Sequence, residues 1–335
     1  MKKFMKVCGI TVLIIFLLGL ILVTAGRLGG GRNTLENQIL NNVFGFGSDI
    51  LDWGSDWLWN EEWETYDLNI NSVFNTNHSV IRSGNTSADY SGEDIRKLEL
   101  SLGGCVMSLK ESEDGDFHVS AERVQNFQTY TEGDTLYVNS VTSGRWSLSS
   151  TSTSIVIEIP AGVELQNVQM ALGGGKFTAE PILVKELKLE LGGGDFTFES
   201  LHVEDLDCEL GAGRLTIEEL YAENIECDMG AGQIVIENAE TTGNLDFEMG
   251  MGDLDFTGSI PGNLDAECAM GQMRFNILGS KEEDHNYDLE CAAGNLRVGG
   301  SSFSGLASEK KIDNGASSRY RLQCSMGNME VTFSE

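Results

Sequence analysis

Carboxylates provide the most regular chemistry in this sequence. In the second half of the chain, Asp or Glu alternates with apolar residues ahead of a repeated glycine turn, as in Asp207-Cys208-Glu209. The two polar positions recur about every 19 residues, which indicates a repeat architecture. In order along the chain they hold Glu190, Asp207, Glu209, Glu226, Asp228, Asp246, Glu248, Asp265, Glu267, Asp288 and Glu290. In the alignment of the repeats, Lys188 and Arg321 bound this series.

Two interpretations of the carboxylate series remain open. Stacked oxygen ligands suit calcium better than zinc, so the series predicts a calcium-binding or polycation-binding surface. The alternative is a solvated face that keeps a β-surface from aggregating. The calcium candidates are Asp207, Glu209, Glu226, Asp228, Asp246, Glu248, Asp265 and Glu267.

Residues for nucleophilic or acid-base catalysis do not form a pattern. The four histidines, His78, His118, His202 and His285, occupy unrelated positions, and Gly-x-Ser-x-Gly is absent. No Ser-His-Asp or Cys-His set is indicated. We therefore predict no enzyme, no catalytic residues and no cofactor other than calcium.

Every repeat contains a glycine turn. It reads Leu-Gly-Gly-Gly at 172–175 and 191–194, and it varies in later copies. Its last residue is always glycine, which predicts a corner with positive φ or with no room for a Cβ. A phosphate-binding loop would instead need a following helix, and each turn here leads into an alternating apolar pattern. The glycines are Gly175, Gly194, Gly213, Gly232, Gly252, Gly271, Gly294 and Gly327.

The patterns on both sides of these turns predict the fold. Leu206, Cys208 and Leu210 alternate with acidic residues before one turn, and Leu215 and Ile217 continue the period of two after it. Equivalent apolar positions align across repeats, one column being Val168, Leu187, Leu206, Ile225, Leu245, Leu264, Tyr287 and Tyr320. We predict an all-β, single-stranded parallel β-solenoid (a β-helix or β-roll) with rungs of about 19 residues, regular over 168–331. An earlier rung is predicted at 98–109, and a polar loop at 299–316.

Cysteines occur mainly at inward positions of these repeats. Cys208 and Cys227 share one column, and Cys268, Cys291 and Cys324 share another. They are predicted to be buried free thiols, because stacked neighbours point the same way and the spacing of zinc ligands is missing.

The N-terminus carries a targeting signal. Residues 1–6 are basic, and the uncharged apolar run 7–25 is long enough to cross a bilayer. We predict a transmembrane signal anchor with a basic cytoplasmic segment before it. The alternative is a cleaved signal peptide ending near Ala25. Both interpretations place residues 26–335 outside the cytoplasm, and the anchor predicts a single-pass cell-membrane protein.

A Gly- and Trp-rich acidic segment, 26–66, separates this run from the predicted β-domain, 67–335. Its tryptophans suit either a headgroup interface or a short cap on the first rung. The formal net charge of −30 excludes nucleic acid as a natural partner.

Several segments resemble a bacterial family of domains of unknown function labelled "putative adhesins". They are Ile95-Arg-Lys-Leu-Glu-Leu, Glu132-Gly-Asp-Thr-Leu-Tyr-Val, Ile157-Glu-Ile-Pro-Ala-Gly162 and the Leu-Gly-x-Gly turns. The resemblance covers about residues 67–334, and it implies a membrane-anchored ectodomain of β-strand repeats, sometimes accompanying envelope-stress systems. It supplies no site residues.

The combined prediction is a noncatalytic scaffold of the cell envelope. It would act as an adhesin-like or envelope-stress accessory protein, with the membrane and cell-wall or other envelope components as partners. The alternatives are a calcium-binding surface module and a carbohydrate-active β-helix enzyme.

Overall fold

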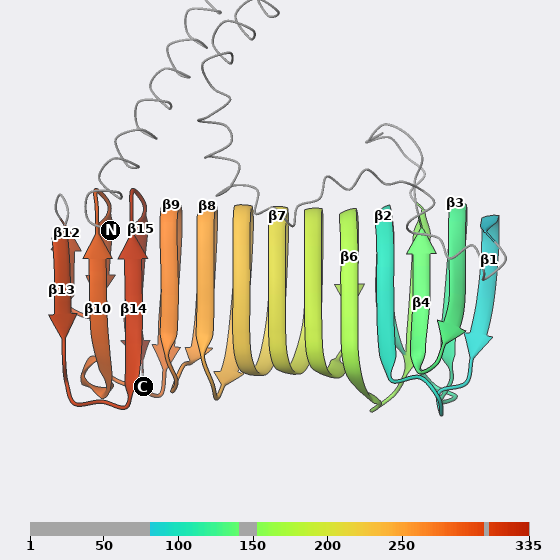
Figure 1. Cartoon of the computed structure of the whole chain (residues 1–335), viewed down its shortest axis with the longest axis horizontal. Coiled ribbons are helices and arrows are strands. Elements are labelled where there is room, and N and C mark those ends of the chain that lie inside the picture. Colours follow the sequence, from blue (N-terminus) through green and yellow to red (C-terminus); the bar gives the residue numbers. More distant parts are fainter. Residues whose placement is uncertain (1–80, 141–152, 305–307, 335) are drawn as a thin grey trace, which may run out of the picture. The chain divides into compact units, whose positions relative to one another are not determined.

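The computed structural model describes residues 81–140, 153–304 and 308–334, and these residues form one large β-sheet system. The strands of its first part are β1 (Arg82–Tyr90), β2 (Lys97–Ser112), β3 (Phe117–Glu132), β4 (Thr135–Ser140), β5 (Ser154–Pro160), β6 (Glu164–Ala179) and β7 (Ile182–Thr241). The second part contains β8 (Leu245–Ser259), β9 (Leu264–Leu278), η1 (Glu282–Asp284), β10 (His285–Cys291), β11 (Asn295–Val298), β12 (Ser301–Ser304), β13 (Ser308–Ile312), β14 (Ser318–Cys324) and β15 (Asn328–Ser334). Figure 1 shows the strands side by side in a row from β1 to β13.

Strands β6 to β9 stack in chain order. Each repeat pairs in parallel with the next one in matching register, so that Ile225 faces Leu245 and Leu245 faces Leu264. Strand β7 continues for 60 residues because its ladder passes unbroken through several corners. We call one repeat of this stack, two straight segments joined by a glycine corner, a rung. The predicted parallel register of about 19 residues is therefore confirmed over these strands.

The core lies between the two straight segments of every rung. The period of two places one apolar column inward on each segment, and Leu206, Ile225 and Leu245 are each at most 2% exposed. Burying a side chain of this size contributes about 1.5–3 kcal/mol relative to leaving it in water. Because each rung covers only its neighbours, the core is continuous along the stack and the end rungs need other strands to cover them.

The glycine corners have little room for a side chain. Gly194 has a φ of 137°, and Gly213 has no positive φ, but a Cβ there would lie 2.5 Å from the carbonyl oxygen of Gly194. Stacking of one corner directly on the previous one brings the two backbones this close. All eight glycines of the series would place a Cβ against the backbone of a neighbouring corner.

The N-terminal end closes through antiparallel strands. Strand β2 pairs in parallel with β4 on one segment and with β5 on the other. Strand β3 then runs antiparallel to both β4 and β5, which completes a closed circuit of pairing. Strand β1 adds to β3 in the antiparallel sense.

At the C-terminal end the rungs are out of chain order. The rung formed by β14 and β15 pairs directly with β9, and the earlier rung formed by β10 and β11 pairs on its far side. The Tyr column therefore runs from Leu264 to Tyr320 and then to Tyr287. Strands β12 and β13 cover the last rung in the antiparallel sense, where the sequence predicted only a polar loop at 299–316.

The predicted fold class is wrong as a whole, although the all-β assignment holds. A single-stranded parallel solenoid requires parallel rungs in chain order. The described strands instead include, at one end, a closed circuit in which β3 runs antiparallel to β4 and β5, and, at the other end, an inserted rung. Period-2 patterns specify which face of a strand is buried, but they do not specify the direction or the order of the strands.

The predicted transmembrane helix and single-pass membrane localisation are also corrected. Across residues 81–140, 153–304 and 308–334, the structure has no helix of the length and apolar character that a bilayer crossing requires. The predicted segments 1–6, 7–25 and 26–66 lie outside the described residues.

Candidate functional site: an acidic groove

The carboxylate positions lie on the outward side of the segment before each corner. Asp207 and Glu209 point outward because Leu206, Cys208 and Leu210 between them point into the core. Parallel pairing in matching register then places equivalent carboxylates on adjacent rungs, about 4.8 Å apart. The result is a two-column surface, which we call the acidic face: Asp207, Glu226, Asp246 and Asp265 form the first column, and Glu209, Asp228, Glu248 and Glu267 form the second.

All eight calcium candidates lie on this face, and Glu190 extends the second column beside Glu209, with which it shares Lys188. Asp288 and Glu290 do not continue the face directly. The inserted β14 places Arg321 between Asp265 and Asp288. An Arg321 Nη1 lies 2.7 Å from Asp265 Oδ2, and Gln323 donates a hydrogen bond to Glu267. Arg321 therefore divides the carboxylate series instead of bounding it, and Asp288 and Glu290 lie beyond that division.

A lysine closes the opposite end of the acidic face. Lys188 Nζ lies 3.6 Å from Glu190, 3.7 Å from Asp207 and 3.8 Å from Glu209. These exposed ion pairs are individually weak. The middle rungs, which carry Glu226, Asp228, Asp246 and Glu248, have no basic residue opposite them in the two columns.

Partial burial raises the pKa values of these carboxylates, and crowding adds to the effect in the middle rungs. Partial burial, followed by repulsion from Glu248, Glu226, Asp246 and Asp207, raises the pKa of Asp228 to about 6. The pKa values of Glu209, Asp246, Glu248, Asp265 and Glu267 also rise, each with partial burial as the largest cause. The acidic face is thus paired with basic residues at its two ends, whereas the carboxylates of its middle rungs mainly face one another.

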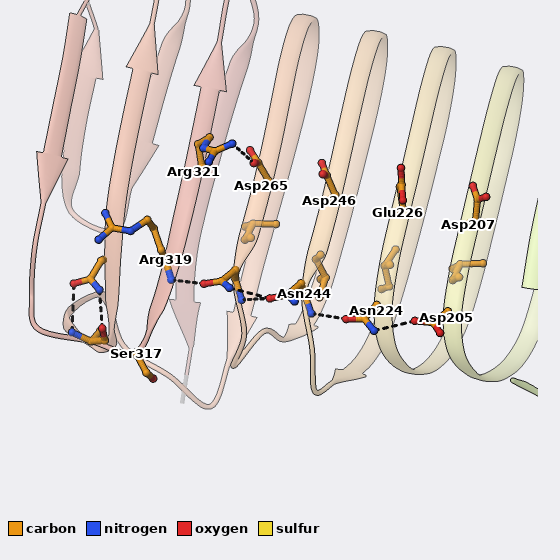
Figure 2. A pocket seen from close by; sticks show the side chains of 17 residues that line it. Asp205, Asp207, Asn224, Glu226, Asn244, Asp246, Asp265, Ser317, Arg319 and Arg321 are labelled. Carbon is orange, nitrogen blue, oxygen red and sulfur yellow. Dashed lines mark hydrogen bonds and ion pairs between the residues drawn. The ribbon is translucent and has the colours of Figure 1, made fainter. Parts of the chain in front are cut away.

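A row of amides runs beside the first carboxylate column. Asn224 Nδ2 donates to Asp205 Oδ1 at 2.8 Å, and Asn263 Nδ2 donates to Asn244 Oδ1 at 2.9 Å. The backbone N–H of Asn244 donates to Asn224 Oδ1 at 3.0 Å. The row ends where the backbone N–H of Arg319 donates to Asn263 Oδ1 at 2.9 Å. Figure 2 shows this amide row parallel to the carboxylates.

Between these side chains lies an open groove of about 860 Å³. Its long sides are the amide row and the first carboxylate column, and its end is formed by Ser317, Arg319 and Arg321 (Figure 2). The groove therefore offers hydrogen-bond acceptors and negative charge along its length and positive charge at one end. A ligand that fits these charges is elongated and cationic.

The arrangement does not form a metal centre. Among the residues that the structure describes, no group of three or more His, Cys, Asp or Glu side chains is arranged to hold a metal ion. Calcium binding therefore stays a prediction, now limited to weak association with carboxylate pairs.

Sequence reasoning missed the amide row and Arg319. Asn224, Asn244 and Asn263 recur at the rung spacing, and this spacing was the available signal. Asparagine ladders of this kind stabilise stacked strands because each amide can both donate and accept. The position of Arg319 depends on the inserted rung, which no local pattern reveals.

Comparisons with known proteins agree with the β-strand repeats. Residues 95–332 match the model of the family described as Toastrack DUF4097. No curated protein matches the chain.

Solved structures with some similarity to the chain include three bacterial proteins. A "putative adhesin" of Bacteroides fragilis is 13% identical, covers 75% of this chain and 98% of its own, and has a TM-score of 0.41. A "putative cell adhesion protein" of Clostridium sporogenes is 11% identical, with 76% and 100% covered and a TM-score of 0.26. A "putative lipid binding protein" of Parabacteroides distasonis is 12% identical, with 76% and 96% covered and a TM-score of 0.37. The predicted resemblance is confirmed by the family match, and the chain belongs to the Toastrack DUF4097 family.

Proposed function

We propose that this chain is a noncatalytic, adhesin-like scaffold that binds a cationic segment of a partner macromolecule along the acidic groove. The observation that carries the proposal is the set of carboxylates on the middle rungs, which have no basic residue opposite them in the two columns. Partial burial, followed by repulsion from neighbouring carboxylates, raises the pKa of Asp228 there to about 6. The regular stack supports it, because a rigid row of rungs presents its charges at a fixed repeat.

Electrostatics favours a polycation over a single ion. Two like charges about 4.8 Å apart repel by roughly 0.9 kcal/mol in water, and a chain of cations laid along the columns relieves several such repulsions together. Arg319 and Arg321, which pair with Asp288 and Asp265, make this end of the groove less negative than its middle. They would therefore limit how far a cationic chain extends and set its register.

Binding of short charged peptides tests this proposal. Fluorescently labelled oligolysine should bind the full chain, and oligoglutamate should not. Affinity for oligolysine should fall at least tenfold when Glu226→Lys and Asp246→Lys are combined, and it should weaken steeply with salt. The family relationship alone predicts no such charge selectivity.

A matched variant distinguishes the effect of charge in the groove from the effect of the net charge of the chain. Glu218→Lys with Glu237→Lys makes the same change in net charge on exposed residues of adjacent rungs outside the groove. This control should retain most of the affinity. Equal losses in the two double variants would show that oligolysine only senses the net charge of −30, and the groove proposal would then fail. The envelope-stress role and the cell-wall partner stay predictions from the family resemblance.

A further inference from the structure

The C-terminal rungs bring three thiols into one inward column. Cys268, Cys324 and Cys291 lie on β9, β14 and β10, and they pair directly in that order because β14 is inserted between the other two. Each is at most 3% exposed. Cys324 therefore has a thiol neighbour on each side.

The glycine corners give these sulfur atoms their space. A Cβ on Gly327 would lie 2.6 Å from Cys268 Sγ, and a Cβ on Gly294 would lie 2.7 Å from Cys324 Sγ. Each thiol thus occupies the volume that a side chain of the neighbouring corner would fill, close to backbone N–H groups. The Cys-x-x-Gly spacing of these rungs creates this packing.

The groups around Cys324 favour its thiolate. The Cys268 thiol, the backbone of Gly327 and Asn295 and the Cys291 thiol each act to lower the pKa of Cys324. Donors aimed at a sulfur favour the thiolate. They lower the pKa of Cys324 to about 7, against the opposing effect of burial.

The other thiol pair provides an internal contrast. Cys208 and Cys227 are also adjacent in one inward column and are also buried. The hydrogen bond with Cys208 and complete burial raise the pKa of Cys227 well above its ordinary value, just as the hydrogen bond with Cys324 and burial raise the pKa of Cys268. The two columns differ because backbone groups of a glycine corner act on Cys324, whereas none acts on Cys227. Cys105, a buried thiol of the N-terminal rungs, has its pKa raised to about 12 by burial.

We propose that Cys324 is a peroxide-reactive thiol that forms a disulfide with either Cys268 or Cys291. The thiolate of Cys324 attacks one oxygen of a peroxide, so that the O–O bond breaks, the sulfur becomes a sulfenic acid and hydroxide (or alkoxide) leaves. The thiol of a neighbouring rung then attacks this sulfur, water leaves, and the S–S bond forms. Two thiols are oxidised, and one peroxide is reduced.

Backbone geometry allows either pairing. Adjacent parallel strands lie about 4.8 Å apart, which falls within the Cα separation of about 4.4–6.8 Å that disulfides span. Because stacked thiols point the same way in the reduced column, the bond forms only after one of the two side chains rotates. Hydrogen peroxide is close to water in size, so a small local opening at the end rungs admits it. Since Cys324 can pair with only one neighbour at a time, each chain yields one disulfide and one remaining thiol in this column.

Thiol mapping after peroxide treatment tests the proposal. The native full chain is treated with hydrogen peroxide, quenched, denatured, alkylated without reduction, and digested with trypsin and a Glu-specific protease. The second cut is needed because Cys227 and Cys268 share the tryptic segment 215–274. We expect Cys324 linked to Cys268 or Cys291, while Cys105, Cys208 and Cys227 remain alkylated. The rate should rise as the pH passes through about 7.

Single variants sharpen the assignment. Cys268→Ser should direct the bond entirely to Cys291, Cys291→Ser should direct it to Cys268, and Cys324→Ser should leave no disulfide in this column. Because the wild-type map needs no variant, the proposal can fail even if a substitution prevents folding. A Cys208–Cys227 bond as the main product, equal oxidation of all buried thiols, or an unreacted Cys324 would overturn it.

Discussion

The rungs of β6 to β9 and the rungs of β10 to β15 use the same repeat but assemble it differently. In the first region each rung pairs with the next one along the chain, and in the second β14 and β15 enter between β9 and the earlier pair β10 and β11. The buried columns nevertheless continue through both regions, as Leu264, Tyr320 and Tyr287 show. Local patterning therefore determines the form of a rung, and the connections determine its place in the stack.

The largest expected effect concerns the chain-ordered region. Gly252 has a φ of 133°, and a Cβ there would overlap the carbonyl oxygen of Gly232. Gly252→Ala should lower the free energy of unfolding by about 3 kcal/mol, through backbone strain and overpacking. Gly104→Ala is the matched control, because a Cβ at Gly104 meets nothing within 4 Å. Equal urea midpoints for the two variants would remove the steric account of the corners.

The next effect concerns the connection that inserts β14. Asn286 Oδ1 accepts from the N–H of Asn314 at 2.9 Å, and its Nδ2 donates to the carbonyl of Ala316 at 2.7 Å. Asn286→Ala leaves these backbone groups without that partner, which should cost about 1–3 kcal/mol. Hydrogen exchange should then accelerate in β10 and β14 while β7 keeps its protection. Uniform acceleration over both regions would show that the inserted rung does not open separately.

Sequence patterns predicted the form of the rungs but not their order in the stack. The alternation around Leu206 and Leu215 correctly identified inward positions, since period 2 and burial are local consequences of strand geometry. The strand that pairs with Tyr287 could not be found in this way. The rung before Tyr287 and the rung after it have similar apolar patterns, so the sequence does not show which rung lies beside β9. The two carboxylate columns of the acidic face could be predicted, because they follow from the same period of two. Arg321 was placed at its boundary only because chain order was assumed.

Titration of the acidic face gives a smaller effect with a defined sign. The folded pKa of Asp228 is raised to about 6, so its ionisation opposes folding above that pH, and the penalty disappears as the pH falls through 6 toward the unfolded value near 4. Asp228→Asn should therefore raise the Tm at pH 7 and have little effect at pH 4. Glu218→Gln, outside the face, removes one exposed carboxylate and is the matched control, whose Tm change is measured at the same two pH values. A stabilisation by Asp228→Asn that is the same at both pH values would rule out charge repulsion as its cause.

The smallest effect tests whether the charge of the chain-ordered rungs attracts simple cations. The described residues offer carboxylate pairs, such as Glu226 beside Asp246, but no group that surrounds a metal ion. Calcium at a concentration equal to its Kd would stabilise a single site by only about 0.4 kcal/mol. We expect calcium to raise the Tm slightly above that of an ionic-strength-matched sodium control, because a divalent ion can contact two rungs together. Combining Glu226→Lys with Asp246→Lys should abolish this difference. It should also raise stability at low salt, because the two lysines repel only each other while each attracts the flanking carboxylates of the first column, such as Asp265 beside position 246. Identical Tm values in calcium and sodium would show that the acidic face binds no simple ion specifically. Any selective binding would then require a polycation long enough to contact several rungs.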